Sequence, residues 1–496
     1  MKQLVKTVLQ LVFICITHSF AIAQDPVRTD TADITPVVRQ EVAIKKDTAR
    51  DPHLYNMYGD LLNDDPVYNK RAPVWQPAVR VLATDAFNWA VARYVYNFDW
   101  ARISLASWKS NLREGFEWDA DRFGINFIGH PHSGNYYFNI ARSHGYSYWG
   151  SMPFAVGGSL VWEYFGENGP PSINDIINTP LSGMFLGEII YRVSSNILDD
   201  RTRGRERVLR EIFAGIINPP RALARLTQGK MFRVTTKEVY QKEPLNITLN
   251  GGFHYIHKTD SGVGKNNAIL NIQLDYGNPF EDRRRKPFDV FRLRTELSYG
   301  DTKRLLTNVN GYGILFGKNT GKNKTLIGAF QHFDYWNNSI FEVGTLGFGP
   351  GLIMRTPVRK HSNIYSSFHL AVVPLAGNNS QYGADTSEFR HYNFGGGFEG
   401  KVEETFNLHN WATLGFTGFY YWLHTYNGFP GNSLVMIFKP TVTVRLFKNL
   451  NIGFEHHIYR NDRFLKDLPN LRISNTEEKV FLKLYLEDPK RNGKYH

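Results

Sequence analysis

The sequence predicts an α+β protein in which a helical N-terminal domain is followed by an antiparallel transmembrane β-barrel of about twelve strands. Residues from about 78 to 235 repeat apolar side chains every three or four positions, which is the period of an α-helix. Residues from about 245 to 487 alternate between the two faces of a strand, and one of these faces carries charged side chains. The change of period predicts two structural parts.

The first 24 residues have the composition of a secretory signal peptide. They contain two lysines, Lys2 and Lys6, an apolar run at 8–16, and a small-residue motif that ends at Ala23. Cleavage is therefore expected after Ala23, giving a signal peptide over 1–23. The one cysteine of the chain, Cys15, lies inside this segment. The predicted mature chain thus has no thiol for a disulfide, a metal site or catalysis.

The predicted mature chain is basic. Loss of Lys2 and Lys6 leaves 56 Lys and Arg against 46 Asp and Glu, a net charge of +10. In an exported protein this charge favours outer-membrane lipids and lipopolysaccharide as partners, and it disfavours nucleic acid. No later stretch reaches the roughly 18 uncharged apolar residues of a membrane-spanning helix, so strands are expected to cross the membrane. The oligomeric state does not follow from the sequence.

Residues 24–77 are predicted to form a flexible periplasmic tether, because they are polar and punctuated by prolines. The helical domain of unknown function follows over 78–235, where Val79, Leu82 and Ala86 share one helical face. Ser172 is a candidate N-cap, and Thr179-Pro180 predicts the start of another helix. On that helix Gly183 and Gly187 are four residues apart, so another backbone can approach closely there.

Alternation defines the predicted barrel over 245–487, which is followed by a tail at 488–496. In the run at 289–300 apolar residues alternate with Arg292, Arg294 and Glu296. Such charges would be very costly in a dry sandwich core but are ordinary in the polar lumen of a membrane barrel. Because the last strand lacks a terminal aromatic residue, a soluble all-β domain is the alternative. Twelve runs are predicted, near 245–257, 266–276, 289–300, 306–317, 325–336, 339–354, 361–375, 389–402, 410–425, 432–447, 450–461 and 476–487.

A cluster of histidines and carboxylates in the helical domain is the candidate functional site. His130 and His132 flank a proline, and Glu163 and Glu167 are four residues apart on a predicted helix, so their carboxylates share one face. With further carboxylates, the two histidines offer nitrogen and oxygen ligands for zinc or another divalent metal. The candidate catalytic residues are His130, Glu163 and Asp175, and the candidate metal ligands are His130, His132, Glu167 and Glu188.

Two other interpretations of these residues remain open at the level of sequence. In the structural one, His130 caps a helix that begins near Ser133, Glu163 pairs with Arg142, and Glu188 pairs with Arg192; buried ion pairs of this kind resemble active sites. In the nucleophilic one, His130 activates Ser133 or Ser159 and Asp175 orients it, but the chain has no G-x-S-x-G motif to support it.

Between about residues 120 and 192 the chain contains four motifs, in the order HPHSGNYYFNIARSHG, GSLVWEYFGE, PSINDIINTP and GMFLGEIIYR. Their shared positions (HPxxGxxY, WEYxxE, PSxND and TPxxGxxxGE) resemble an uncharacterised family of bacterial outer-membrane proteins, described only as a domain of unknown function. The resemblance implies a location in the cell outer membrane and implies no activity. Two function classes follow, a plugged transport or structural envelope protein and a membrane-embedded hydrolase of lipid or glycan that uses the His/Glu/Asp site.

Overall fold

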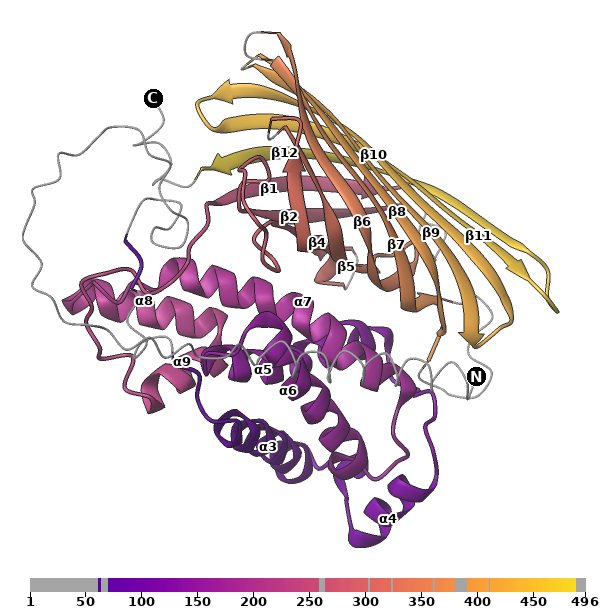
Figure 1. Ribbon diagram of the computed structural model, residues 1–496. Coiled ribbons are helices and arrows are strands. Elements are labelled where there is room, and N and C mark those ends of the chain that lie inside the picture. The colour runs from indigo at the N-terminus through magenta and orange to yellow at the C-terminus, as the bar shows by residue number, and fades with distance from the viewer. Residues whose placement is uncertain are drawn as a thin grey trace, which may run out of the picture.

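The computed structural model describes residues 61–63, 70–257, 264–301, 304–322, 324–359, 362–379, 390–409 and 411–487. The predicted signal peptide, most of the predicted tether and the tail at 488–496 lie outside these ranges. The described helices precede the strands along the chain, and Figure 1 shows the helices gathered together on one side of the barrel.

The helical domain combines α-helices with short π-helical and 3-10 segments. None of the helices in the described ranges is both long and apolar enough to cross a membrane. The segments are α3 (Trp75–Ala90), η1 (Val91–Val95), η2 (Asp99–Ala101), α4 (Leu105–Arg113), η3 (Ile125–Gly129), α5 (His130–Ser143), α6 (Tyr148–Val161), η4 (Trp162–Gly166), α7 (Ile173–Ile197), α8 (Gly204–Ile217) and α9 (Pro219–Thr227).

Helix α7 is the longest helix of the described chain and organises this domain. It runs without interruption through Pro180, so the separate helix start predicted at Thr179-Pro180 was wrong. Proline has no backbone N–H, so Pro180 costs α7 one backbone hydrogen bond. The packing of α7 side chains against both α5 and the barrel outweighs this loss. The predicted close approach at Gly183 is confirmed, since a Cβ atom on this residue would lie 2.5 Å from the carbonyl carbon of Gly134 on α5.

Twelve antiparallel strands form a closed barrel in which each strand pairs with its neighbours in sequence and β1 pairs with β12. This architecture confirms the predicted fold class, and the strands lie close to the twelve predicted runs. They are β1 (Leu245–Ile256), β2 (Lys265–Tyr276), β3 (Phe291–Gly300), β4 (Leu306–Thr320), β5 (Thr325–Asn337), β6 (Glu342–Arg359), β7 (Ser362–Asn379), β8 (Tyr392–Leu408), β9 (Ala412–Asn427), β10 (Gly431–Phe447), β11 (Leu450–Leu465) and β12 (Leu471–Leu486).

The helical domain lies against the outer wall of the barrel and not inside its lumen. On β5 the carboxylate of Asp334 faces the lumen, where the Lys401 ammonium of β8 lies 2.7 Å away. The next residue back along the strand, Phe333, must face the opposite side because successive side chains alternate. Its ring stacks on Phe185 of α7, with ring centroids 5.7 Å apart. The helices therefore cover the outward face of β5.

Glycines on the outward face of neighbouring strands make room for aromatic side chains of the helical domain. A Cβ atom on Gly344 of β6 would lie 2.4 Å from the ring of Phe127, and one on Gly377 of β7 would also lie 2.4 Å from that ring. The interface has polar contacts as well, since the Gln331 amide of β5 donates to the Leu181 carbonyl oxygen at 2.7 Å. The helical domain and this part of the wall thus share one core.

Candidate functional site

Two π-helical segments place the polar cluster of the helical domain. Segment η3 ends directly before His130, the first residue of α5, and η4 contains Glu163 and is followed by Glu167. Asp175 lies in the first turn of α7. A π-helical turn inserts an extra residue and turns the following side chains, and such turns are frequent at functional sites. The three candidate catalytic residues therefore come from three helical segments that meet.

His130 is the centre of this cluster. Its Nε2 lies 3.5 Å from Oδ1 of Asp175 and 4.0 Å from Oδ2 of Asp121. Its Nδ1 lies 3.4 Å from the hydroxyl of Thr179. Within the described residues, Asp119, His130 and Asp175 form a group whose possible ligand atoms all lie within 4.8 Å of one another. This set of one nitrogen and two oxygen donors suits a divalent cation.

Asp119 and Asp121 were missed by sequence reasoning because no spacing connects them with the histidine motif. A parallel bridge between Glu117 and Ser172 brings their segment to the start of α7. Two backbone hydrogen bonds form this bridge: Glu117 N–H donates to the Pro171 carbonyl at 3.0 Å, and Ile173 N–H donates to the Glu117 carbonyl at 2.8 Å. Only tertiary structure could reveal this contact.

The buried carboxylates have strongly perturbed acidity. Burial raises the pKa of Glu163 well above its usual range, and the nearby charges of Asp175 and Glu167 raise it further. Burial also raises the pKa of Asp175, with a further contribution from the charge of Asp119. The Glu163 carboxyl accepts a hydrogen bond from the Ser172 backbone N–H at 2.8 Å. Protonated carboxyls at neutral pH, or a bound cation, would each relieve the repulsion.

The histidine in the cluster has a raised pKa, although burial alone lowers it. A hydrogen bond with Asp121, together with the negative charges of Glu163, Asp119 and Glu167, outweighs burial and favours the imidazolium form of His130. Conversely, burial raises the pKa of Glu167, while the charge of His130 and the hydrogen bond from the Trp162 indole, 2.8 Å long, lower it.

The other two candidate ligands lie elsewhere. The His132 ring packs edge-on against Tyr136, with centroids 5.0 Å apart, and burial lowers the pKa of His132. The Glu188 carboxylate is fully buried and is held by two guanidinium groups, from Arg142 at 2.7 Å and from Arg192 at 2.8 Å. The structure therefore does not gather His132 and Glu188 around His130.

The structural interpretation is confirmed for the pair Glu188 and Arg192, but the expected pair of Glu163 with Arg142 was wrong. Arg142 binds Glu188 instead, because α5 and α7 pack side by side and bring these two residues together. The nucleophilic arrangement is not formed either. The Ser133 hydroxyl donates to a carbonyl in the preceding turn, and the Ser159 hydroxyl donates to the Asp175 carbonyl at 3.3 Å.

The barrel lumen holds a second polar site, a vestibule of about 430 Å³. Ion pairs join side chains of different strands inside it. The Lys479 ammonium lies 2.7 Å from the Glu296 carboxylate, and the Arg294 guanidinium lies 2.9 Å from the Glu403 carboxylate. Arg294 and Glu296 belong to the alternating charged residues that predicted a polar lumen, and each has a partner of opposite charge. The charged residues that line the vestibule are six bases, Arg292, Arg294, Arg355, Lys439, Lys479 and Lys483, and four acids, Asp275, Glu296, Glu403 and Glu455.

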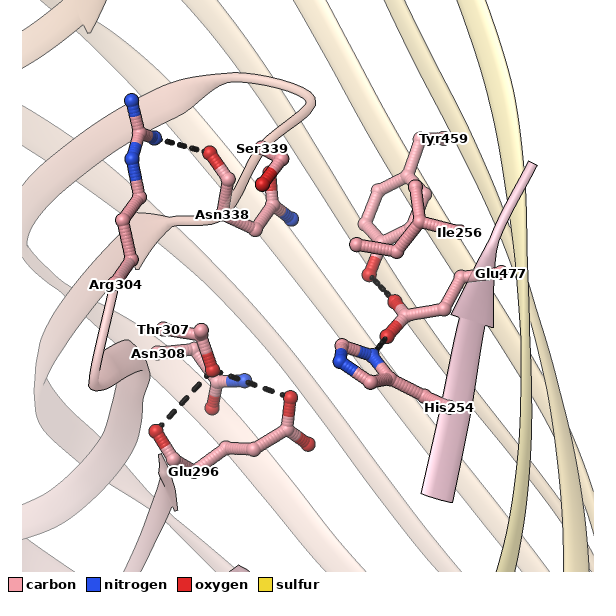
Figure 2. Close-up of a pocket in the computed structure, with 10 residues that line it drawn as sticks. All are labelled: His254, Ile256, Glu296, Arg304, Thr307, Asn308, Asn338, Ser339, Tyr459 and Glu477. Atoms are coloured by element: carbon pink, nitrogen blue, oxygen red, sulfur yellow. Dashed lines mark hydrogen bonds and ion pairs between the residues drawn. The ribbon is translucent and has the colours of Figure 1, made fainter. Parts of the chain in front are cut away.

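Beyond this vestibule the lumen is closed by side chains that meet across the barrel. Phe341, from the loop between β5 and β6, packs edge-on against Tyr459 of β11 on the opposite wall, with centroids 5.5 Å apart. Figure 2 shows Tyr459 and His254 both bonded to the Glu477 carboxylate, facing the loop residues Asn338 and Ser339. The space between them is a cavity of only about 10 Å³. The barrel is therefore plugged by its own loop and lumen side chains.

The comparisons with known proteins assign no activity. Residues 115–220 match the model of a family described as a domain of unknown function, DUF3943. No curated protein matches the chain.

Solved outer-membrane barrels show weak structural similarity to this chain. An outer-membrane channel from Pseudomonas putida F1 is 6% identical and aligns over 49% of this chain and 95% of its own, with a TM-score of 0.27. The outer-membrane channel DcaP of Acinetobacter baumannii is 10% identical over 49% and 97%, with a TM-score of 0.24. Scores this low carry no argument. Residues 115–220 thus resemble a family without an assigned activity.

Proposed function

We propose that the protein is an integral outer-membrane β-barrel with a closed lumen, acting as a gated transporter or a structural element of the envelope. One observation carries the proposal, namely the alternation in strands such as β3 and β12 between an inward face with charged residues and an outward apolar face. On β10 the outward Val442 is 44% exposed, and on β12 the outward Leu482 is 50% exposed. A wall of such residues would aggregate in water but is stable against acyl chains.

The closure of the lumen separates this proposal from an open pore. Phe341 and Tyr459 belong to a cluster of buried apolar side chains, which includes Trp336 and Tyr421 and fills this level of the described lumen. A steady current would therefore require movement of the loop between β5 and β6. The resting protein is therefore expected to act as a structural element of the envelope or as a transporter that opens only when gated. In a transporter, the polar vestibule would be the place where a solute binds.

Membrane fractionation tests this proposal. The full chain, expressed in a Gram-negative host, should be recovered with the outer membrane after a urea wash and should migrate faster on a gel before boiling than after it. Planar bilayers containing the purified chain should show no steady current. Recovery in the soluble periplasmic fraction would contradict the membrane assignment, and a constant open current would contradict the closed lumen.

A divalent cation site at Asp119, His130 and Asp175 is the second candidate function, favoured by the convergence of their ligand atoms within 4.8 Å. A cation held there would act as a Lewis acid, and Glu163 would then serve as a general base toward a lipid or glycan ester. Metal analysis of the purified chain tests this candidate. A stoichiometric divalent metal that is lost in His130→Asn supports it, and a metal-free protein of normal stability contradicts it.

A further inference from the structure

We infer that the helical domain is itself embedded in the membrane, where the apolar faces of α3, η1, α8 and α9 contact lipid acyl chains. The inference rests on the proposed membrane location of the barrel and extends it to a domain that has no membrane-spanning helix in the described chain. Its basis is the orientation of these helices, which expose apolar residues and bury several charged ones; their exposed charges are Arg205 and Glu206, in the first turn of α8.

Helix α8 shows this inverted orientation most clearly. Arg207 and Glu211 are buried, and the guanidinium of Arg207 lies 3.0 Å from the carboxylate of Glu211. On the opposite side of the helix Val208, Ile212 and Ile216 are exposed, and Ile216 reaches 71%. A helix on the surface of a soluble domain places its apolar face toward the core. Helix α8 places it toward the outside.

Helix α9 repeats the arrangement. Arg225 is buried and binds the carboxylates of Glu211 at 2.7 Å and Asp200 at 2.8 Å. Leu223 and Leu226 of the same helix are exposed. The charge of the buried arginine is thus balanced by carboxylates inside the domain, while the leucines lie on its surface. The paired charges offset the cost of burying them, and the leucines leave an apolar outer face of the kind that lies against acyl chains.

The apolar face recognised in the sequence of α3 is also turned outward. Val79 and Leu82 are exposed, and none of the exposed residues of α3 carries a charge. The one acidic residue of the helix, Asp85, is buried and accepts a hydrogen bond from the Tyr137 hydroxyl. In η1, which continues α3, Tyr94 is 73% exposed.

These helices are neighbours in the domain. Arg80 of α3 donates to the Thr227 hydroxyl at the end of α9, at 2.5 Å, and α9 is joined to α8 through Arg225 and Glu211. Aromatic residues border the surface after η1, where Tyr96 stacks on Phe98 with centroids 5.4 Å apart. Tyrosine and tryptophan are enriched where a membrane meets water.

The position of the domain selects lipid as the occupant. The helices cover outward strand faces that would otherwise contact lipid, as the packing of Phe333 on Phe185 shows. The outer surface of the domain therefore takes the place of that part of the barrel wall. It continues the apolar perimeter formed by outward residues such as Leu482. Helices that lie in the membrane plane need no spanning length.

Lipid-phase quenching of site-specific fluorophores tests this inference on the full chain. Single cysteines would be introduced in a Cys15→Ser background at Phe87 of α3 and at Ile216 of α8. Leu482→Cys on the barrel wall serves as the lipid-facing control, and Asp467→Cys in the exposed turn between β11 and β12 serves as the water-facing control. Each variant would be labelled with a polarity-sensitive dye and reconstituted in phosphatidylcholine vesicles with or without brominated acyl chains.

The expected result is that labels at Phe87→Cys and Ile216→Cys are quenched within a factor of two of the label at Leu482→Cys, while the label at Asp467→Cys is unaffected. Unquenched helical labels beside a quenched Leu482→Cys label would overturn the inference and leave the barrel proposal intact. If the helical labels were instead shielded by a second copy, they would also be unquenched and would show energy transfer between chains. An unquenched Leu482→Cys label would contradict the barrel proposal itself.

Discussion

Gly183→Ala is expected to unfold the helical domain while the barrel stays closed. A Cβ atom at this position would lie 2.5 Å from the backbone carbonyl carbon of Gly134, and backbone atoms cannot rotate away as a side chain can. Overpacking typically costs about 1–3 kcal/mol, and we expect the upper end of this range because α5 and α7 must separate along their whole contact. Protease digestion of the reconstituted chain should then remove the helical domain and spare the strands.

Gly157→Ala provides the matched control for this experiment. Gly157 also lies in a helix, α6, but a Cβ atom there would meet no atom within 4 Å. Alanine is a better helix former than glycine by about 1 kcal/mol, so Gly157→Ala should be as stable as the parent or more stable. Equal protease resistance of Gly183→Ala and Gly157→Ala would contradict the packing of α5 on α7 through glycine.

Substitutions at Glu163 should distinguish a structural carboxyl from a working one. Glu163→Ala leaves the buried Ser172 N–H without its acceptor, at a cost of about 1–3 kcal/mol. Glu163→Gln keeps an acceptor oxygen and should fold nearly normally. Because burial raises the pKa of Glu163, the folded state holds its proton more tightly than the unfolded chain does.

The sign of the pH effect follows from that shift. Stability contributed by protonated Glu163 is complete below the ordinary glutamate pKa of about 4.3, and it is lost as the pH rises toward the raised folded value. Thermal melting measured from about pH 4, near the ordinary glutamate pKa, upward through neutral pH should show this loss in the parent chain. Glu163→Gln should reduce the slope. If both chains show the same slope, Glu163 is not protonated in the folded state, and a cation beside His130 becomes the better explanation.

The alternation of β3 shows why the barrel could be predicted from sequence. Arg292 and Arg294 fall on one face only if the segment is a strand, and their partner Glu403 lies on β8, far away in sequence. The pattern thus specifies the inward face but not the pairing. The close approach at Gly183 was likewise predictable from a local spacing of small residues, because it depends only on helical geometry.

The orientation of the helices could not be predicted in the same way. The spacing of Val79 and Leu82 specifies one face of α3, and the same spacing describes a helix that turns this face inward or outward. Asp119 reaches His130 only through the bridge between Glu117 and Ser172, which no local pattern encodes. Both the orientation of α3 and the approach of Asp119 to His130 depend on contacts between segments that are distant in the chain.

The most direct test of the account is whether neighbouring residues of one strand alternate between water and lipid. On β10, Thr441 and Thr443 line the vestibule, while Val442 and Val444 are exposed on the outward face. Single cysteines at these four positions, in a Cys15→Ser chain, would be treated with a membrane-impermeant maleimide in isolated outer membranes. The account predicts labelling of Thr441→Cys and Thr443→Cys, and labelling of Val442→Cys and Val444→Cys only after denaturation. Equal labelling of all four variants in the intact membrane would contradict a transmembrane barrel with a polar lumen.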